Sequence, residues 1–327
     1  RVSLWAFGGG YFVFVVLVLA LRYSILPNIE QYRPVIERIA GQNLGQTVRI
    51  GRIESSWDGI NPDLTLKDVQ IFDAEGRPAL AFSRVEAVLS WWSVPSAQLK
   101  LRLLRIVEPT LNLRRDSEGK FFVAGIPLNT GTSDTDVSDW VLSQRRIRID
   151  DATLIWEDDL RGAQPLRLEA VHFALDNSGR QHRFGLTAVP PENLASPIDV
   201  RGDFRGADID ELDGWSGKAF AEVDYVDLAA WRQWVDYPVA LPHGRGALRT
   251  WIGFSKGRLS DVTADMSLQD ASVRLAQTLP SLDLKRMSGR IAVSFLANGV
   301  AVTGRGLALE THQAISSDAA RKEASIQ

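Results

Sequence analysis

Beyond residue 46, apolar and polar residues alternate along most of the chain with a period of two. Four segments show the alternation clearly: residues 99–103, 110–114, 146–150 and 291–295. A period of two is typical of β-strands that have one apolar and one polar face. Turn-forming pairs such as Asp58–Gly59 and Lys256–Gly257 separate the segments, and their spacing predicts about a dozen antiparallel strands.

A second pattern, apolar-x-apolar-x-x-apolar, recurs along the same region. It begins at Leu64, Leu80, Ile147, Leu166 and Leu282. The extra residue shifts the alternation by one position, as a β-bulge or a tight hairpin does. The recurrence predicts one supersecondary unit that repeats as a sheet grows by addition. Any meander of amphipathic strands can also produce this pattern by chance, so both readings stay open.

Helical patterns are few outside the N-terminus. Pro34 suits the first turn of a short helix, and Gly41 is placed to end it. Helical spacing also appears over residues 136–145 and 227–235, where Asp227 is a suitable N-cap.

The N-terminus carries one long apolar segment. Twenty residues from Val2 to Leu21 contain no charge, and as a helix they would be about 30 Å long, which matches a bilayer core. A cleaved signal peptide has a shorter apolar core and a small-x-small site, which the residues before Arg22 lack. We therefore expect an uncleaved transmembrane helix over residues 1–22. Its membrane-anchoring residues are predicted to be Leu4, Trp5, Phe12, Phe14, Leu17 and Leu21.

The composition argues against several functional classes. Among 327 residues, 37 Lys and Arg stand against 40 Asp and Glu, so no basic excess indicates nucleic acid as a partner. The chain has no cysteine, and its four histidines lack metal-ligand spacing. No catalytic motif is present either, so we expect neither an enzyme, nor a metal site, nor a cofactor. Because no closing element precedes Gln327, we expect a portion of a longer protein.

Alternation alone leaves the architecture open. The apolar strand faces could be the core of a closed sandwich, in which a second sheet covers them, or they could line an open groove.

The order of the elements narrows this choice. A membrane helix, a short helix and a long run of amphipathic strands together resemble the AsmA-like superfamily. Local strings resemble the YhdP family of that superfamily over nearly the whole chain. The matching residues are Leu26, Pro27, Ile29, Tyr32, Arg33, Pro34, Ile36, Ser55, Trp57, Pro62, Leu64, Arg180, His182, Arg183, Asp203, Arg205, Trp215, Ser216, Gly217, Asp227, Leu228, Trp231, Trp251, Lys256 and Gly257.

The resemblance implies a mainly β protein with an N-terminal transmembrane helix and an extended, curled antiparallel sheet that forms a hydrophobic groove, with few short helices. The implied segments are a transmembrane helix over 1–22, a juxtamembrane helix and linker over 23–45, an AsmA-like periplasmic β-groove over 46–309, and a polar tail or truncated end over 310–327. The predicted groove lining is Leu64, Leu66, Leu99, Leu101, Leu103, Leu111, Leu113, Ile147, Ile149, Ile291 and Val293.

The function that the resemblance implies is phospholipid transport. The chain would be the inner-membrane-anchored entry segment of a bridge-like transporter between the inner and outer membranes of a Gram-negative bacterium. Its β-region would lie in the periplasm, and its partners would be phospholipids, the inner membrane and outer-membrane components. The alternative is a scaffold, similar to the TamB branch, that assists outer-membrane protein assembly by pairing its sheet edge with client strands.

Overall fold

The computed structural model describes residues 2–72, 76–96, 98–123, 126–127, 140–207, 212–235, 240–274, 281–296 and 299–311. The N-terminal segment is helical throughout: α1 Val2–Ala20, η1 Leu21–Ile25, η2 Leu26–Tyr32 and α2 Arg33–Leu44. Three short helices lie further along the chain: α3 Ser93–Ser96, η3 Leu212–Gly214 and α5 Leu228–Trp231. All other regular elements among the described residues are strands, apart from a helical turn at 140–143.

The strands belong to one sheet. The first eight are β1 Thr47–Asp58, β2 Asn61–Phe72, β3 Pro78–Leu89, β4 Leu101–Val107, β5 Thr110–Arg115, β6 Phe121–Val123, β7 Ile126–Pro127 and β8 Arg146–Asp158. The others are β9 Leu166–Ser178, β10 Gln181–Val189, β11 Ile198–Arg205, β12 Ser216–Asp227, β13 Ala240–Ser255, β14 Arg258–Arg274, β15 Leu282–Leu296 and β16 Gly299–Thr311. Strand β16 ends two residues beyond the boundary predicted at 309, and residues 312–327 of the predicted tail lie outside the described residues.

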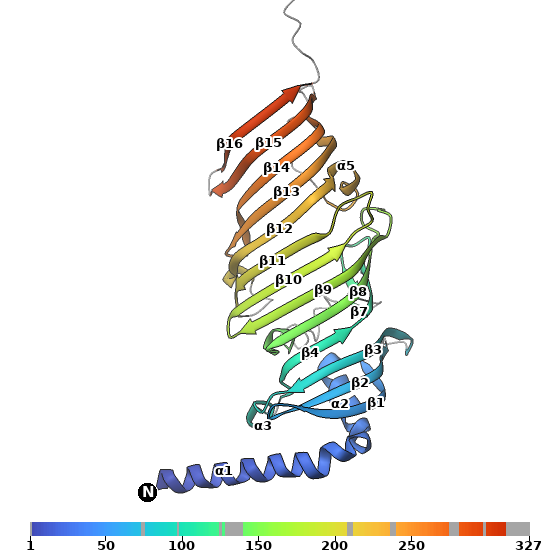
Figure 1. The fold of residues 1–327 in the computed structure, drawn as a ribbon, viewed down its shortest axis with the longest axis vertical. Coiled ribbons are helices and arrows are strands. Elements are labelled where there is room, and N and C mark those ends of the chain that lie inside the picture. Colours follow the sequence, from blue (N-terminus) through green and yellow to red (C-terminus); the bar gives the residue numbers. More distant parts are fainter. Residues whose placement is uncertain are drawn as a thin grey trace, which may run out of the picture.

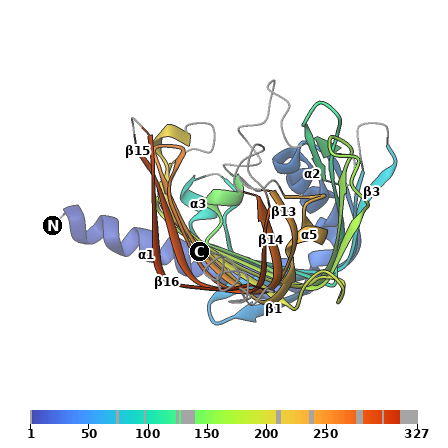
Figure 2. The ribbon, with the colours of Figure 1, turned by 90° about the horizontal axis from the view of Figure 1, so that it is seen from above.

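The sheet is open and strongly curled. Its main path runs β1-β2-β3-β4-β8 and then in chain order to β16, so each new strand adds beside the previous one (Figure 1). Viewed along its length, the sheet is a U-shaped trough, and helices α2 and α5 lie inside the U (Figure 2). We call the inner side of this trough the concave face and the outer side the convex face. The predicted mainly β, curled architecture is confirmed.

The pairing is antiparallel, as predicted, everywhere in the described sheet except at β8. Strands β4 and β5 both pair with β8 in parallel. Glu108 and Pro109 interrupt what would otherwise be one strand, because Glu108 has a φ of 51° and proline has no backbone N–H. Strand β8 runs in the same direction as β4 and β5 and pairs with both.

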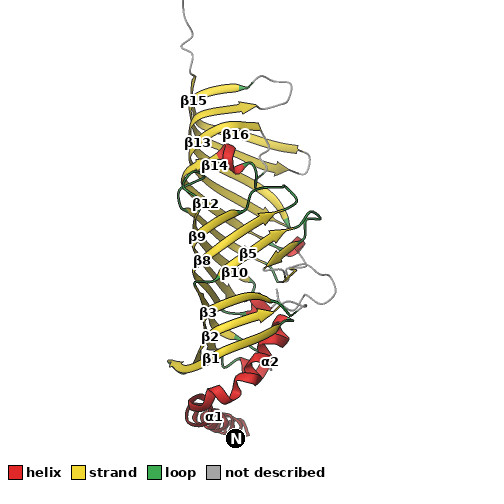
Figure 3. Cartoon of the chain, turned by 90° about the vertical axis from the view of Figure 1, so that its right-hand side faces the viewer, coloured by secondary structure: helices red, strands yellow, loops and turns green. Residues whose placement is uncertain are grey.

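Residues with positive φ inside strands account for three of the five repeats of the apolar-x-apolar-x-x-apolar pattern, those that begin at Leu64, Ile147 and Leu166. Asp68, Asp151, Ala170 and Asp270 have φ between 45° and 56°, and each directly precedes an apolar residue of the concave face. A residue in this conformation adds one position to the strand and bends it, so the next apolar side chain returns to the same face. Such bends favour curvature of the sheet. Figure 3 shows the sheet from the side, with α1 and α2 at its β1 end.

The short helices follow local signals with one exception. Asp227 caps α5 as predicted, since its Oδ1 accepts a hydrogen bond of 3.0 Å from the backbone N–H of Ala230. The predicted end of the first short helix at Gly41 was wrong. Helix α2 continues to Leu44 and ends at Gly45, which adopts the left-handed conformation with a φ of 65°. Of the helix predicted over 136–145, residues 140–143 are helical, and residues 136–139 lie outside the described part.

The N-terminal helix fits a membrane anchor. Among the described residues, one helical stretch, Phe14–Gln42, has the length and apolar character that a bilayer crossing requires, and little of its most apolar window is buried. Five of the six predicted anchor residues, Leu4, Trp5, Phe12, Phe14 and Leu17, lie in α1, and Leu21 begins η1.

Candidate functional site

The concave face carries continuous apolar rows that cross the main path of the sheet. Following the paired residues from one strand to the next gives a row of concave residues that crosses the sheet from β1 to β16. We call it the first concave row. Its members are Ser55, Leu64, Ala87, Leu104, Ile147, Leu175, Phe184, Gly202, Ala219, Ile252, Val262, Val293 and Val302. Because neighbouring strands are about 4.8 Å apart, the twelve steps of this row extend about 58 Å.

A second concave row lies two residues away along each strand. Its members are Ile53, Leu66, Val85, Ile106, Ile149, Phe173, Leu186, Val200, Ala221, Thr250, Ala264, Ile291 and Gly304. Thr250 is its one residue with a polar side-chain group. Two parallel apolar rows give the concave face an uninterrupted apolar band along its length.

The convex face has the opposite character. Between the two concave rows lies a register row that includes Glu54, Glu86, Arg105, Arg148 and Arg201. Ion pairs link neighbouring strands on this face, for example Lys67 to Glu54 at 2.6 Å, Arg249 to Glu222 at 2.5 Å and Arg290 to Asp265 at 2.5 Å. Charged side chains therefore gather on the convex face, which also carries a few aromatic residues such as Phe220 and Trp251.

Ionised carboxylates are favoured on the convex face. The hydrogen bond from the Arg290 guanidinium holds the pKa of Asp265 below its ordinary value of 3.8. Burial tends to raise the pKa of Asp176, but hydrogen bonds from Arg146 and Arg148 outweigh burial, and the net pKa of this carboxyl is lowered.

Helices η2 and α2 close one end of the concave face. Apolar side chains of these helices, including Leu26, Ile29 and Ile36, form one core with the concave residues of β1, β2 and β3. In that core Ile53 and Leu64 are only 4% and 6% exposed, whereas Val302 at the other end of the trough is 66% exposed. The chain itself therefore fills the concave face at the β1 end. A second core, in which Leu228 of α5 packs with Leu268 and Ala271 of β14 and Leu284 of β15, covers part of it further along, and β16 is open.

An aromatic stack runs along the middle of the concave face. Phe173, Phe184 and Phe204 lie on the consecutive strands β9, β10 and β11, with ring centroids 6.5 and 6.0 Å apart. Phe254 on β13 meets Phe204 edge-on at 6.4 Å. The rings of Phe184 and Phe204 lie over Gly202, where an added Cβ would be 2.2 Å from Phe184. Glycine here lets two aromatic rings lie against the backbone.

A buried polar network fastens the helical turn at 140–143 to the sheet. Gln144 accepts from the backbone N–H of Leu101 at 2.7 Å and donates to the carbonyl of Trp140. Asn177 donates to the carbonyl of Gln144 at 2.8 Å, and its Oδ1 lies 2.8 Å from Nδ1 of His182. Nothing in the sequence pattern pointed to Gln144, which is fully buried.

Most of the predicted lining residues share the concave face. Members of the two concave rows are Leu64, Leu66, Ile147, Ile149, Ile291 and Val293, and Leu111 and Leu113 pair in register with Leu154 and Trp156 of β8 on the same side. Leu101 is buried and pairs with Leu89, which packs into the concave core.

Two predicted lining residues do not lie at concave positions of a strand. Leu99 precedes β4 and belongs to no strand. Leu103 pairs with Val88, one position from the concave pair Leu104 and Ala87, so it lies on the convex face with Arg105. A register shift between Leu101 and Leu103 breaks the simple alternation, and Leu104 and Ile106 take the concave positions instead.

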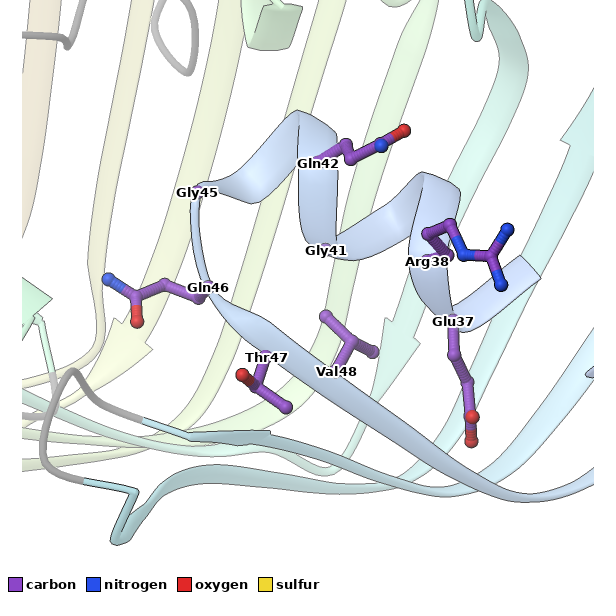
Figure 4. A pocket seen from close by; sticks show the side chains of 8 residues that line it. All are labelled: Glu37, Arg38, Gly41, Gln42, Gly45, Gln46, Thr47 and Val48. Atoms are coloured by element: carbon purple, nitrogen blue, oxygen red, sulfur yellow. The ribbon is translucent and has the colours of Figure 1, made fainter. Parts of the chain in front are cut away.

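A polar hollow lies at the end of α2, outside the apolar band. It has a volume of about 540 Å³ and is lined by Glu37, Arg38, Gly41, Gln42, Gly45, Gln46, Thr47 and Val48. Figure 4 shows Gln42 and Arg38 extending from the helix, with Thr47 and Val48 on the strand beneath it. Its charged and amide side chains do not suit an acyl chain.

Comparison with known proteins identifies a matching family. A family model described as YhdP protein matches residues 1–325. No curated protein and no solved structure matches the chain. The match extends over the membrane-helix segment, the helical closure and the whole trough, so the chain belongs to the YhdP family.

Proposed function

We propose that the trough holds the acyl chains of phospholipids on its concave face and lets them move along its length. The observation that carries this proposal is the pair of concave rows, in which only Ser55 and Thr250 have a polar side-chain group over the thirteen strands of the main path. At about 58 Å, the band is longer than the roughly 30 Å hydrocarbon thickness of a bilayer.

The energetics favour movement along the band. Each CH₂ group removed from water gains about 0.8 kcal/mol. Because paired positions on successive strands have similar apolar side chains, a lipid gains nearly the same free energy at each of them. Its headgroup can remain in water at the open side of the U. The transfer makes or breaks no covalent bond, and we propose no enzymatic step and no cofactor.

The position of the anchor sets the direction that we propose. Helix α1 would hold the β1 end of the trough at the inner membrane of a Gram-negative bacterium, with the sheet extending through the periplasm towards the outer membrane. Because α2 fills the concave face beside β1, β2 and β3, lipids would join the band from β4 onwards. The chain would thus be the entry segment of a bridge between the two membranes.

Photo-crosslinking at adjacent residues tests this proposal. Ile291 lies on the concave face and Ala292 on the convex face of β15, so a photoreactive amino acid at either site samples one side of the same strand. We expect phospholipid adducts from position 291 and at least fivefold fewer from position 292. Equal capture at both sites, or capture at neither, would contradict lipid binding on the concave face.

The scaffold alternative requires a free sheet edge. At β1 that edge is occupied, because Ile50 and Ile53 donate their backbone N–H groups to Glu37 and Glu30, and Arg33 donates to the carbonyl of Gly51. A client strand would have to pair with the opposite edge of the sheet, at β16. Proline substitutions in β16 that abolish function while Ile291→Lys is tolerated would favour the scaffold over lipid transport.

A further inference from the structure

Two loops of the sheet lie beside the membrane helix. The β1–β2 turn carries Ile60 at its tip, and the β3–β4 loop carries Trp91 and Trp92 directly before α3. Figure 1 shows this turn and the α3 segment over α1, at the edge of the trough nearest the N-terminal helix. In the described part of the chain they are joined to each other, since the indole N–H of Trp91 donates to the carbonyl of Ile60 at 3.1 Å.

Contacts also join these loops to the helix. The ring of Trp91 meets Phe14 of α1 edge-on, with 5.0 Å between the ring centroids. On the neighbouring strand end, the guanidinium of Arg22 lies over the ring of Trp57 at 5.4 Å. The loops therefore have a defined position relative to α1.

The surface that these loops present to solvent is apolar. Ile60 is 65% exposed and Trp92 is 73% exposed, and Tyr23, at the end of the apolar helix, is 72% exposed. Large apolar side chains grouped on adjacent loops are typical of a binding surface. Tryptophan and tyrosine prefer the membrane–water boundary, where the ring meets the acyl chains and the polar group meets water.

We propose that Ile60, Trp91 and Trp92 form a second membrane contact that inserts into the headgroup region of the bilayer crossed by α1. This contact would set the β1 end of the trough against the membrane surface. It rests on the membrane anchor and does not require that the trough carry lipid.

Fluorescence quenching in liposomes tests the contact. Because the chain has no cysteine, single cysteines can be introduced into the full chain and labelled with an environment-sensitive nitrobenzoxadiazole dye. The probes are Ile60→Cys and Trp92→Cys. Val16→Cys, in α1, reports insertion of the helix. Ser255→Cys, an exposed position at the end of β13 on the same edge of the sheet, is the matched control. Vesicles contain phosphatidylcholine and phosphatidylglycerol with a lipid spin-labelled near the headgroup.

We expect the spin-labelled lipid to reduce the fluorescence at positions 16, 60 and 92 at least twofold and to leave position 255 unchanged. Quenching at 16 with none at 60 and 92 would overturn the proposal while leaving the anchor in place. Absence of quenching at position 16 would overturn both. Since the assay does not depend on lipid capture at Ile291, its result is independent of the proposed transport function. Circular dichroism of each labelled variant checks that the sheet is folded.

Discussion

The backbone N–H of Ile50 donates a hydrogen bond of 2.7 Å to Oε1 of Glu37. Glu37 belongs to α2 and Ile50 to β1, so a side chain of the helix takes the place that another strand would occupy at this edge. Glu30 does the same for the N–H of Ile53 at 3.0 Å. An exposed strand edge invites pairing with other chains, and these carboxylates prevent it at β1.

Removing the acceptor should destabilise the β1 end. Glu37→Ala leaves the partly buried N–H of Ile50 without its partner, and we expect the free energy of unfolding to fall by about 1–3 kcal/mol. Glu37→Gln keeps an acceptor oxygen and should cost less than half as much. Urea unfolding monitored by circular dichroism measures both. Glu192→Ala, at an exposed loop position, is the control, and an equal loss there would contradict a specific role for Glu37.

The strand residues with positive φ predict a substitution that raises the stability of the protein. Ala170 in β9 has a φ of 45°, a conformation that costs an L-residue about 1–2 kcal/mol and glycine almost nothing. Ala170→Gly should therefore stabilise the protein by up to about 1 kcal/mol. Ala174→Gly, in the same strand but without a positive φ, should destabilise it by about 0.5–1 kcal/mol. Thermal unfolding of both variants checks the pair, and a loss of stability in both would contradict the strained bulge.

The aromatic stack should not tolerate a side chain beneath it. Gly202→Ala places a Cβ 2.2 Å from Cε1 of Phe184 and 2.6 Å from Cε2 of Phe204. Both rings would have to move, and we expect a loss of about 1–3 kcal/mol. Gly185→Ala is the matched control, since nothing lies within 4 Å of its added Cβ. Chemical denaturation of the two variants measures the difference, and equal stabilities would show that the rings can shift freely.

Ion pairs of the convex face predict a dependence on pH. The folded-state pKa of Asp265 is lowered by Arg290, so its stabilisation is present above the ordinary value of 3.8 and is lost as the pH falls through the lowered value. The difference in unfolding free energy between the wild type and Asp265→Asn should therefore be largest near neutral pH and vanish in strong acid. Urea titrations from pH 7 to pH 2.5 measure it.

A double variant separates the pair from other effects. The hydrogen bonds between Arg290 and Asp265 can account for the pH dependence. If they do, Asp265→Asn should change the free energy of unfolding much less in the Arg290→Gln background than in the wild type. A difference that persists in the Arg290→Gln background at neutral pH would assign the effect to another partner of Asp265.

Local sequence signals predicted individual elements well. The N-cap at Asp227 and the turn at Lys256–Gly257 follow from side-chain and backbone chemistry within a few residues. The start of α2 near Pro34 was also predicted, but its end was not. Gly41 and Gly45 both resemble helix-terminating residues, and only the packing of α2 against β1 decides that Gly45 adopts the left-handed conformation.

Assignment of side chains to a face failed where the register shifts. Leu101 and Leu103 alternate perfectly with charged residues, yet the shift opposite Val88 and Leu89 places them on different sides. The alternation in Leu104 and Ile106 is equally good, and no local signal distinguishes the two phases. Cross-strand partners distinguish them, since Ala87 and Ile147 lie beside Leu104 on the concave face.

The sequence by itself determined the membrane-helix segment, the strands with one apolar and one polar face, and the bulges within them, because each depends on residues close together in the chain. The tertiary structure decided that these strands curl into an open trough, that β4 and β5 run parallel to β8, and that α2 fills one end. Those outcomes depend on pairing and packing between distant segments. A period of two fixes which residues share a face of a strand, but only the neighbouring strands decide whether that face is covered or open.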